Sequence, residues 1–204
     1  MRTITYYYAP ISGFAYLGER RLMEIARCAG AEVEFRPIDI QRIFQAAETV
    51  PPGKQPQARL SYRLMDLKRQ AERLGLPINP KPKHWPVPAG LPARLIYATG
   101  ALGHPQHPLS FAILSAVYAR EQDISDPETL KEILKGLDLD AEAHFETAET
   151  RDIADRFEAG NAAAIAAGVF GSPTYVFDGE MFFGQDRLDL LAWRLGVTDP
   201  LCES

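Results

Sequence analysis

The stretch YYYAPISGFAYL, residues 6–17, joins a run of aromatic and β-branched residues to a helical pattern. Residues 3–8 favour a buried strand, and an Ala-Pro pair ends it. Ser12 follows directly, before apolar residues at helical spacing that continue to Gly30. The sequence therefore predicts a small hydroxyl at the junction of a strand and a helix.

A second strand is predicted over residues 32–40, where apolar and charged residues alternate. Pro37 indicates an edge position or a strand end, because proline has no N–H for a sheet ladder. Strand, helix and strand in this order form a βαβ unit with parallel strands and a right-handed crossover.

The end of the chain returns to β-structure. Residues 172–184 predict a hairpin that turns at Asp178-Gly179. Residues 186–196 predict a closing helix, with Asp186 as its N-cap and Gly196 after its last turn.

The middle of the chain favours helices. Residues 58–75 carry leucines at three- and four-residue steps, residues 76–92 predict a proline-rich extended loop, and further helices follow to about residue 168. The fold class is α/β, with a four-stranded mixed sheet of βαβ…ββα order. Residues 1–44 and 168–204 form its discontinuous domain, and residues 45–167 form an inserted helical domain.

The composition argues against a membrane protein and against a nucleic-acid-binding protein. The 204 residues are 46% hydrophobic and 24% charged, which is typical of a soluble globular protein. No apolar run is long enough for a bilayer, and the first residues lack a signal-peptide pattern, so a cytoplasmic protein without membrane contact is expected. A net charge of −5 without a basic tract argues against nucleic-acid binding.

Cysteine and histidine usage argues against disulfides and metal. The two cysteines, Cys28 and Cys202, are far apart, and Cys28 is expected to pack as a small hydrophobe. His104 and His107 are predicted to lie in a loop between helices, without a carboxylate or cysteine that would complete a metal site.

Three features together resemble a known family. They are the strand running into SGFAYL (12–17), the helical insertion after βαβ, and the closing GVFGSPTYVFDGEMFFGQDRLDLL (168–191). The chain resembles the thioredoxin-fold branch of 2-hydroxychromene-2-carboxylate isomerases and kappa-class glutathione transferases. Its architecture is also similar to that of bacterial disulfide oxidoreductases. The resemblance implies glutathione as cofactor and a homodimer.

Two roles are open for Ser12. A serine before a helix is an ordinary N-cap. A hydroxyl beside a helix N-terminus also suits the stabilisation of a thiolate, and the resemblance implies that Ser12 activates glutathione. The disulfide oxidoreductases have C-x-x-C where this chain has Ser12-Gly13-Phe14-Ala15, which argues against redox chemistry by the protein itself.

Further contacts to glutathione are implied by the resemblance. Pro173 would be cis, so that the backbone of Ser172 pairs with the peptide, and Gln185 and Asp186 would bind the γ-glutamyl end, with Arg187 nearby. The ordinary alternatives are a strand start at Pro173 and capping or loop roles for the other three.

The substrate-binding candidates are less specific. Lys54 and His84 lie in loops and offer positive charge for an acidic substrate, with a solvated surface as the alternative. Trp85, in the proline-rich loop, is either a packing anchor or a wall for a flat aromatic ring. Tyr8 is the tyrosine of its strand nearest to Ser12.

The resemblance implies a glutathione-dependent isomerase of an aromatic acid such as 2-hydroxychromene-2-carboxylate. Its reaction would be a reversible addition of the thiolate that Ser12 stabilises. The alternatives are a kappa-like transferase that conjugates electrophiles and a non-redox thioredoxin-fold binding module.

Overall fold

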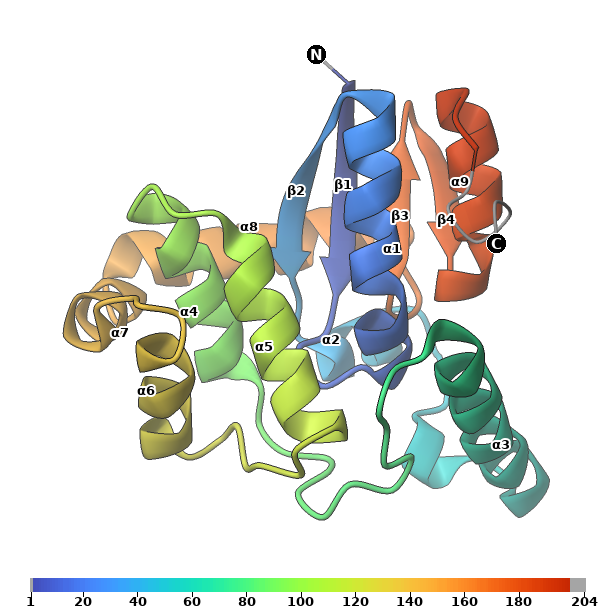
Figure 1. Cartoon of the computed structure of the whole chain (residues 1–204), viewed down its shortest axis with the longest axis horizontal. Coiled ribbons are helices and arrows are strands. Elements are labelled where there is room, and N and C mark those ends of the chain that lie inside the picture. The colour runs from blue at the N-terminus through green and yellow to red at the C-terminus, as the bar shows by residue number, and fades with distance from the viewer. Residues whose placement is uncertain (1, 199–204) are drawn as a thin grey trace.

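The computed structural model describes residues 2–198 and contains a four-stranded sheet in the order β2-β1-β3-β4 (Figure 1). β1 is parallel to β2 and antiparallel to β3, which is antiparallel to β4. The predicted α/β fold with a mixed sheet is confirmed. The strands are β1 (Arg2–Tyr8), β2 (Ala31–Pro37), β3 (Thr174–Phe177) and β4 (Glu180–Phe183).

The alternating side chains of β1 build both faces of the core. Tyr6 and Tyr8 are fully buried in the cluster that includes α1 (Gly13–Ala29), and their rings stack at 4.2 Å. Tyr7 points to the other face, into a cluster with α8 (Arg151–Ala166). α1 accordingly lies in front of the sheet and α8 passes behind it in Figure 1.

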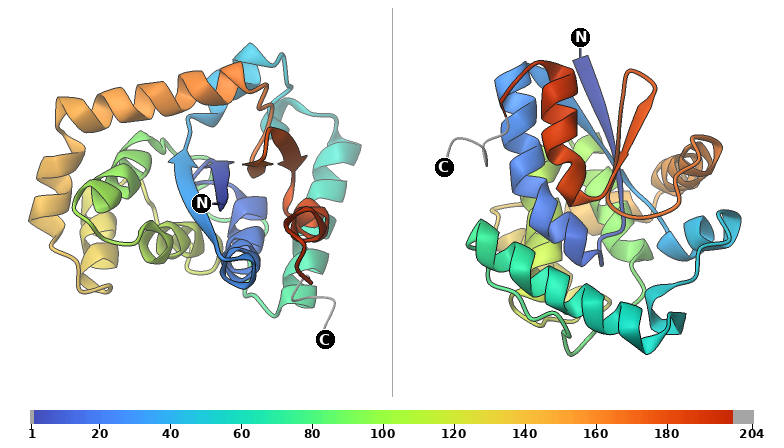
Figure 2. Two further views of the ribbon diagram at one scale, coloured as in Figure 1. Left: turned by 90° about the horizontal axis from the view of Figure 1, so that it is seen from above. Right: turned by 90° about the vertical axis from the view of Figure 1, so that its right-hand side faces the viewer.

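The middle of the chain is helical, as predicted. Figure 2 shows α8 along one side of the sheet, opposite α1 and α9. No helix within residues 2–198 is long and apolar enough to cross a membrane. The remaining helices are α2 (Ile40–Ala46), η1 (Pro52–Lys54), α3 (Gln57–Leu74), α4 (Gly90–Ala101), α5 (Gln106–Tyr118), α6 (Pro127–Lys135), α7 (Ala141–Ala148), η2 (Gln185–Arg187) and α9 (Leu188–Leu195).

The short helix α2 was not predicted. Asp39 caps it by accepting a hydrogen bond from the Gln41 N–H at 2.9 Å. The Asp39 N–H is itself bonded to the Asn161 amide oxygen on α8 at 2.7 Å, so the start of α2 depends on a residue distant in sequence. The domain limits at residues 44 and 168 stay a prediction, and α2 spans the first of them.

The predicted cap of the last helix is wrong. Asp186 lies in η2, and α9 begins at Leu188 without a side-chain cap. The Asp186 carboxylate is instead 2.8 Å from the guanidinium of Arg187. Because the η2 turn directly precedes α9, the N-cap position of α9 is occupied by Arg187 and not by Asp186. Gly196 ends α9 in the left-handed conformation, as predicted.

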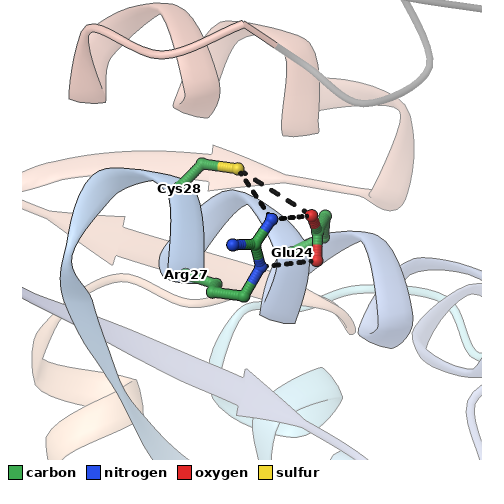
Figure 3. Close-up of polar contacts among 3 residues, drawn as sticks. All are labelled: Glu24, Arg27 and Cys28. Atoms are coloured by element: carbon green, nitrogen blue, oxygen red, sulfur yellow. Dashed lines mark hydrogen bonds and ion pairs between the residues drawn. The ribbon is translucent and has the colours of Figure 1, made fainter.

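Cys28 is exposed, contrary to the expected packing. Its sulfur lies 3.6 Å from Nη2 of Arg27 and 3.9 Å from Oε1 of Glu24 (Figure 3). Ile25 and Ala26 are the residues of this last turn of α1 that face the core. Helical spacing therefore turns Cys28 toward solvent. Cys202 lies outside the described residues.

A buried carboxyl joins α1 to the inserted helices. Glu19 is 0% exposed, and its carboxylate accepts hydrogen bonds from Ser110 at 2.7 Å and from Tyr6 at 3.4 Å. Nδ1 of His107 lies 3.0 Å from the same carboxylate. His107 belongs to α5, so its predicted loop position is wrong. This network holds α5 against the sheet half of the molecule.

We expect Glu19 to make stability depend on pH. Burial raises the pKa of its carboxyl, although His107 and Ser110 oppose the shift. A carboxyl with a raised native pKa stabilises the fold fully below its unfolded pKa of about 4.3, and this contribution is lost as pH rises through the native pKa. The free energy of unfolding of Glu19→Gln, measured with urea relative to wild type, should therefore increase from about pH 4 to about pH 7.

Glu24→Gln is the matched control on the same helix. Glu24 has a pKa lowered by its hydrogen bond to Arg27, so this variant should not show the increase. Parallel stability profiles for wild type and Glu19→Gln would contradict the prediction.

Candidate active site

Ser12 occupies the corner between β1 and α1. Its Oγ accepts a hydrogen bond from the Ala15 N–H at 3.3 Å, which confirms the predicted N-cap. The same hydroxyl donates to the carbonyl oxygen of Ser172 at 3.2 Å. Ser12 is 8% exposed, so its hydroxyl is partly shielded but not sealed from a neighbouring cleft.

The Ser172–Pro173 peptide bond is cis, as the family resemblance implied. Oγ of Ser172 accepts a hydrogen bond from the Ala9 N–H at 2.9 Å. The Pro173 carbonyl accepts one from the Gly184 N–H at 2.9 Å. These contacts fasten the segment between the end of β1 and the end of β4, directly beside Ser12.

The inserted part of the chain holds the same corner from the other side. The Ile11 carbonyl accepts hydrogen bonds from the indole N–H of Trp85 and from the hydroxyl of Tyr118, both at 2.9 Å. Trp85 is therefore an anchor for the residue next to Ser12. Trp85 also lines the adjoining cleft, and its role as a wall for an aromatic ring stays a prediction.

A cleft of about 360 Å³ opens beside Ser12. Its volume is within the range of small-molecule sites. Most of its wall is apolar, and no acidic residue among residues 2–198 lines it. The lining residues are Ala9, Ile11, Ser12, Ile40, Gln41, Phe44, Pro51, Pro52, Gly53, Lys54, Arg63, Trp85, Pro86 and Ser172.

The charged residues of the cleft are Lys54 and Arg63. Lys54 ends η1 and lines the same cleft as Ser12. Its predicted contact with an acidic substrate stays a prediction. Arg63 was missed, because an arginine among the leucines of an amphipathic helix is usually a solvated residue. Helical spacing carried a signal for it, because Arg63 lies three residues after Leu60 and four before Leu67, on the side of α3 that packs against α1.

A family model for the DSBA-like thioredoxin domain matches residues 3–196. The chain belongs to this family. The match covers both ends of the sheet and the whole helical insertion. The match agrees with the cis Ser172–Pro173 bond beside Ser12. Positions 12 and 15, where the disulfide oxidoreductases have cysteines, are occupied here by Ser12 and Ala15.

The similar proteins include isomerases and a glutathione transferase. A 2-hydroxychromene-2-carboxylate isomerase of Sphingobium xenophagum is 29% identical over 93% of this chain and 96% of that protein. The human glutathione S-transferase kappa 1 is 28% identical over 96% and 91%. A solved 2-hydroxychromene-2-carboxylate isomerase structure superposes with a TM-score of 0.80 at 25% identity, covering 95% of this chain and 94% of that one.

Gln185, Asp186 and Arg187 lie in η2, outside the lining of the cleft. Gln185 is 3% exposed, and its carbonyl accepts a hydrogen bond from Arg21 at 3.1 Å. Asp186 and Arg187 are about half exposed and form an ion pair. The turn follows Gly184, whose N–H bonds to Pro173, so it begins next to the Ser172–Pro173 segment.

The structure does not bring Tyr8 and His84 to the cleft. Tyr8 is fully buried, and its hydroxyl lies 2.7 Å from Oγ of Ser110. The alternation of side chains along β1 places Tyr8 on the face of the sheet that α1 covers, away from the cleft. His84 faces Asp123, with 3.7 Å between Nδ1 and Oδ2. Residues 2–198 contain no cluster of three or more His, Cys, Asp or Glu side chains that would suit a metal.

Gly13 should be needed for the close approach of α1 to α3 and α5. A Cβ there would lie 2.9 Å from Cδ2 of Leu67 and 3.0 Å from the Tyr118 ring, which its hydrogen bond to Ile11 holds in place. Overpacking of this kind costs about 1–3 kcal/mol, against a helix-propensity gain of up to about 1 kcal/mol for Ala. After this gain is subtracted, Gly13→Ala should lower the free energy of unfolding in urea by up to about 2 kcal/mol.

Gly53→Ala is the control, because no atom lies within 4 Å of the added Cβ. An equal loss of stability in both variants would show that the contacts at Gly13 are not responsible.

Proposed function

We propose that this protein is a glutathione-dependent isomerase of an aromatic keto or hydroxy acid of the 2-hydroxychromene-2-carboxylate type. The observation that carries the proposal is the Ser12 hydroxyl, which lies at the N-terminus of α1 and at the edge of a cleft whose charged side chains are cations. The similarity to isomerases of that name over most of the chain supports the substrate class.

The residues of the cleft fit glutathione. The tripeptide carries carboxylates and a thiol that must ionise. Lys54 offers a positive charge, and the start of α1 favours an anion. The exposed carboxylate of Asp186 suits the ammonium group of the γ-glutamyl end, with Gln185 and Arg187 beside it. The backbone of Ser172 is the proposed partner of the peptide part, as in strand addition.

When bound, glutathione supplies a thiolate that adds to a conjugated carbon and leaves again, so that a double bond becomes rotatable in between. The Ser12 hydroxyl donates a hydrogen bond to the Ser172 carbonyl oxygen. A thiolate is a stronger acceptor than a carbonyl, so the Ser12 proton would turn to it and free the Ser172 carbonyl for the ligand. Ser12 and the helix dipole would then keep the thiol ionised near neutral pH.

Ser12→Ala should therefore raise the pKa of the bound thiol. A hydrogen bond to a charged group contributes about 1.5–3 kcal/mol, which corresponds to about one to two pH units. The ultraviolet absorbance of the bound thiolate, followed against pH, measures this shift, and calorimetry shows whether glutathione still binds.

Two controls separate this effect from the loss of the helix cap. Ser12→Thr keeps both the hydroxyl and the cap, and should retain the wild-type titration. Ser61→Ala removes an exposed serine on α3 and should change nothing. If wild type and Ser12→Ala titrate alike, Ser12 is a cap only. If neither binds glutathione, a non-redox binding module becomes the better description.

Asp186→Asn should weaken glutathione binding through lost attraction to the γ-glutamyl ammonium. Because Asp186 is about half exposed, the loss should be near 1 kcal/mol, or about fivefold in Kd by calorimetry. Asp189→Asn changes an exposed acid in the first turn of α9 and should leave the Kd unchanged. Equal Kd values for Asp186→Asn and wild type would remove Asp186 from the proposed site.

A kappa-like glutathione transferase is the second candidate. The human kappa 1 enzyme matches about as much of the chain, at 28% identity, as the isomerases do. Both activities would need the same thiolate at Ser12. Product analysis distinguishes them, because a transferase releases the thiol adduct and an isomerase returns free thiol with the rearranged acid. The homodimer and the cytoplasmic location stay predictions.

A further inference from the structure

A second cleft, of about 340 Å³, adjoins the one beside Ser12. The two clefts share Pro52, Gly53, Arg63 and Trp85 in their walls. Ser12 lines only the first cleft, whereas Tyr118 lines only the second. Together they offer a place for the cofactor and, next to it, a place for another small molecule.

The second cleft has two apolar walls. α3 contributes one of them, and the proline-rich loop with Trp85 contributes the other. Such walls suit a flat aromatic or aliphatic body. The apolar side chains of α3 in this wall are Leu60, Leu64 and Leu67.

Arg63 is the cation that belongs to both clefts. Its guanidinium lies over the ring of Phe14, 4.8 Å from the ring centre, and faces the hydroxyl of Tyr118. It is half buried and projects from the middle of a long helix. Lys54 and Lys81, the other cations of the two clefts, are exposed, the first at the end of η1 and the second in the proline-rich loop. Arg63 is therefore the cation best placed to bind an anionic ligand in either cleft.

The charge of Arg63 lacks a close carboxylate within residues 2–198. Asp66, on the next turn of α3, lies 3.5 Å from Arg69 instead and acts on Arg63 only through space. Burial lowers the pKa of the Arg63 guanidinium, which reflects the loss of water around its charge. A half-buried guanidinium with free donors binds an incoming carboxylate strongly, often through two hydrogen bonds.

We propose that Arg63 binds the carboxylate of the second substrate, whose apolar body occupies the cleft between α3 and Trp85. This assignment rests on the proposed function and adds to it a residue that sets specificity. Arg63 makes the protein selective for electrophiles that carry an acid over neutral ones of the same shape.

A matched pair of electrophiles tests the selectivity. Benzylidenepyruvate is a conjugated aromatic keto acid, and benzylideneacetone has a methyl group in place of its carboxylate. Arg63→Met should lower kcat/KM for glutathione addition to the acid by about ten- to a hundredfold, the range for a lost hydrogen bond to a charged group. The value for the ketone should change by less than about twofold, because the ketone has no charge for Arg63 to bind.

Arg59→Met is the control on the same helix. Arg59 is exposed and lines neither cleft, so both rates should stay at wild-type values. Arg63→Lys keeps a positive charge without the planar fork and should retain part of the preference for the acid. An equal loss for acid and ketone in Arg63→Met would assign Arg63 to folding and overturn the proposal.

Calorimetry with benzylidenepyruvate in the absence of glutathione separates this inference from the proposed function. The Kd of the acid should rise by about ten- to a hundredfold in Arg63→Met and not in Arg59→Met. If that happens in a protein that binds no glutathione, the acid site stands and the proposed function fails. If glutathione binds but the Kd of the acid does not depend on Arg63, this inference alone fails.

Discussion

The Ile11 carbonyl oxygen accepts hydrogen bonds from Trp85 and Tyr118, and the position of Ser12 depends on this double contact. Ile11 belongs to the sheet half of the molecule, whereas both donors belong to the helical insertion. The next residue, Ser12, caps α1 and bonds to Ser172, which comes from the far end of the chain. Three distant segments therefore meet at two adjacent residues, and the cleft keeps its shape only while the insertion is docked.

The clefts beside Ser12 are lined by positive charge, although the protein as a whole is acidic. The protein has a net charge of −5, which taken alone repels anions. The clefts nevertheless contain Lys54, Arg63 and Lys81, and the part of the chain that the structure describes adds no acidic residue to their lining. A local arrangement of cations in a partly desolvated cleft outweighs the distant net charge, which water and salt screen. Under the proposed function, an anionic cofactor and an anionic substrate would then fit side by side in an acidic protein.

Local patterns predicted most of the elements. The hairpin at Asp178-Gly179, the left-handed end of α1 at Gly30 and the cap at Ser12 all depend on a few neighbouring residues, and the structure has them as expected. The errors at α2 and at His107 have a common cause in longer-range contacts. α2 begins where Asn161 of α8 reaches it, and His107 extends a helix that its bond to Glu19 holds in place.

The sequence by itself determined the α/β fold, the hydroxyl at the strand–helix junction and the missing cysteines, because periodicity, capping and residue identity are local properties. Only the tertiary structure decided which side chains reach the cleft. It buries Tyr8 under the helices and turns Arg63 inward. The physical reason is that the surface a residue faces is set by the element packed against it, and for α3 those partners are α1, the proline-rich loop and Tyr118.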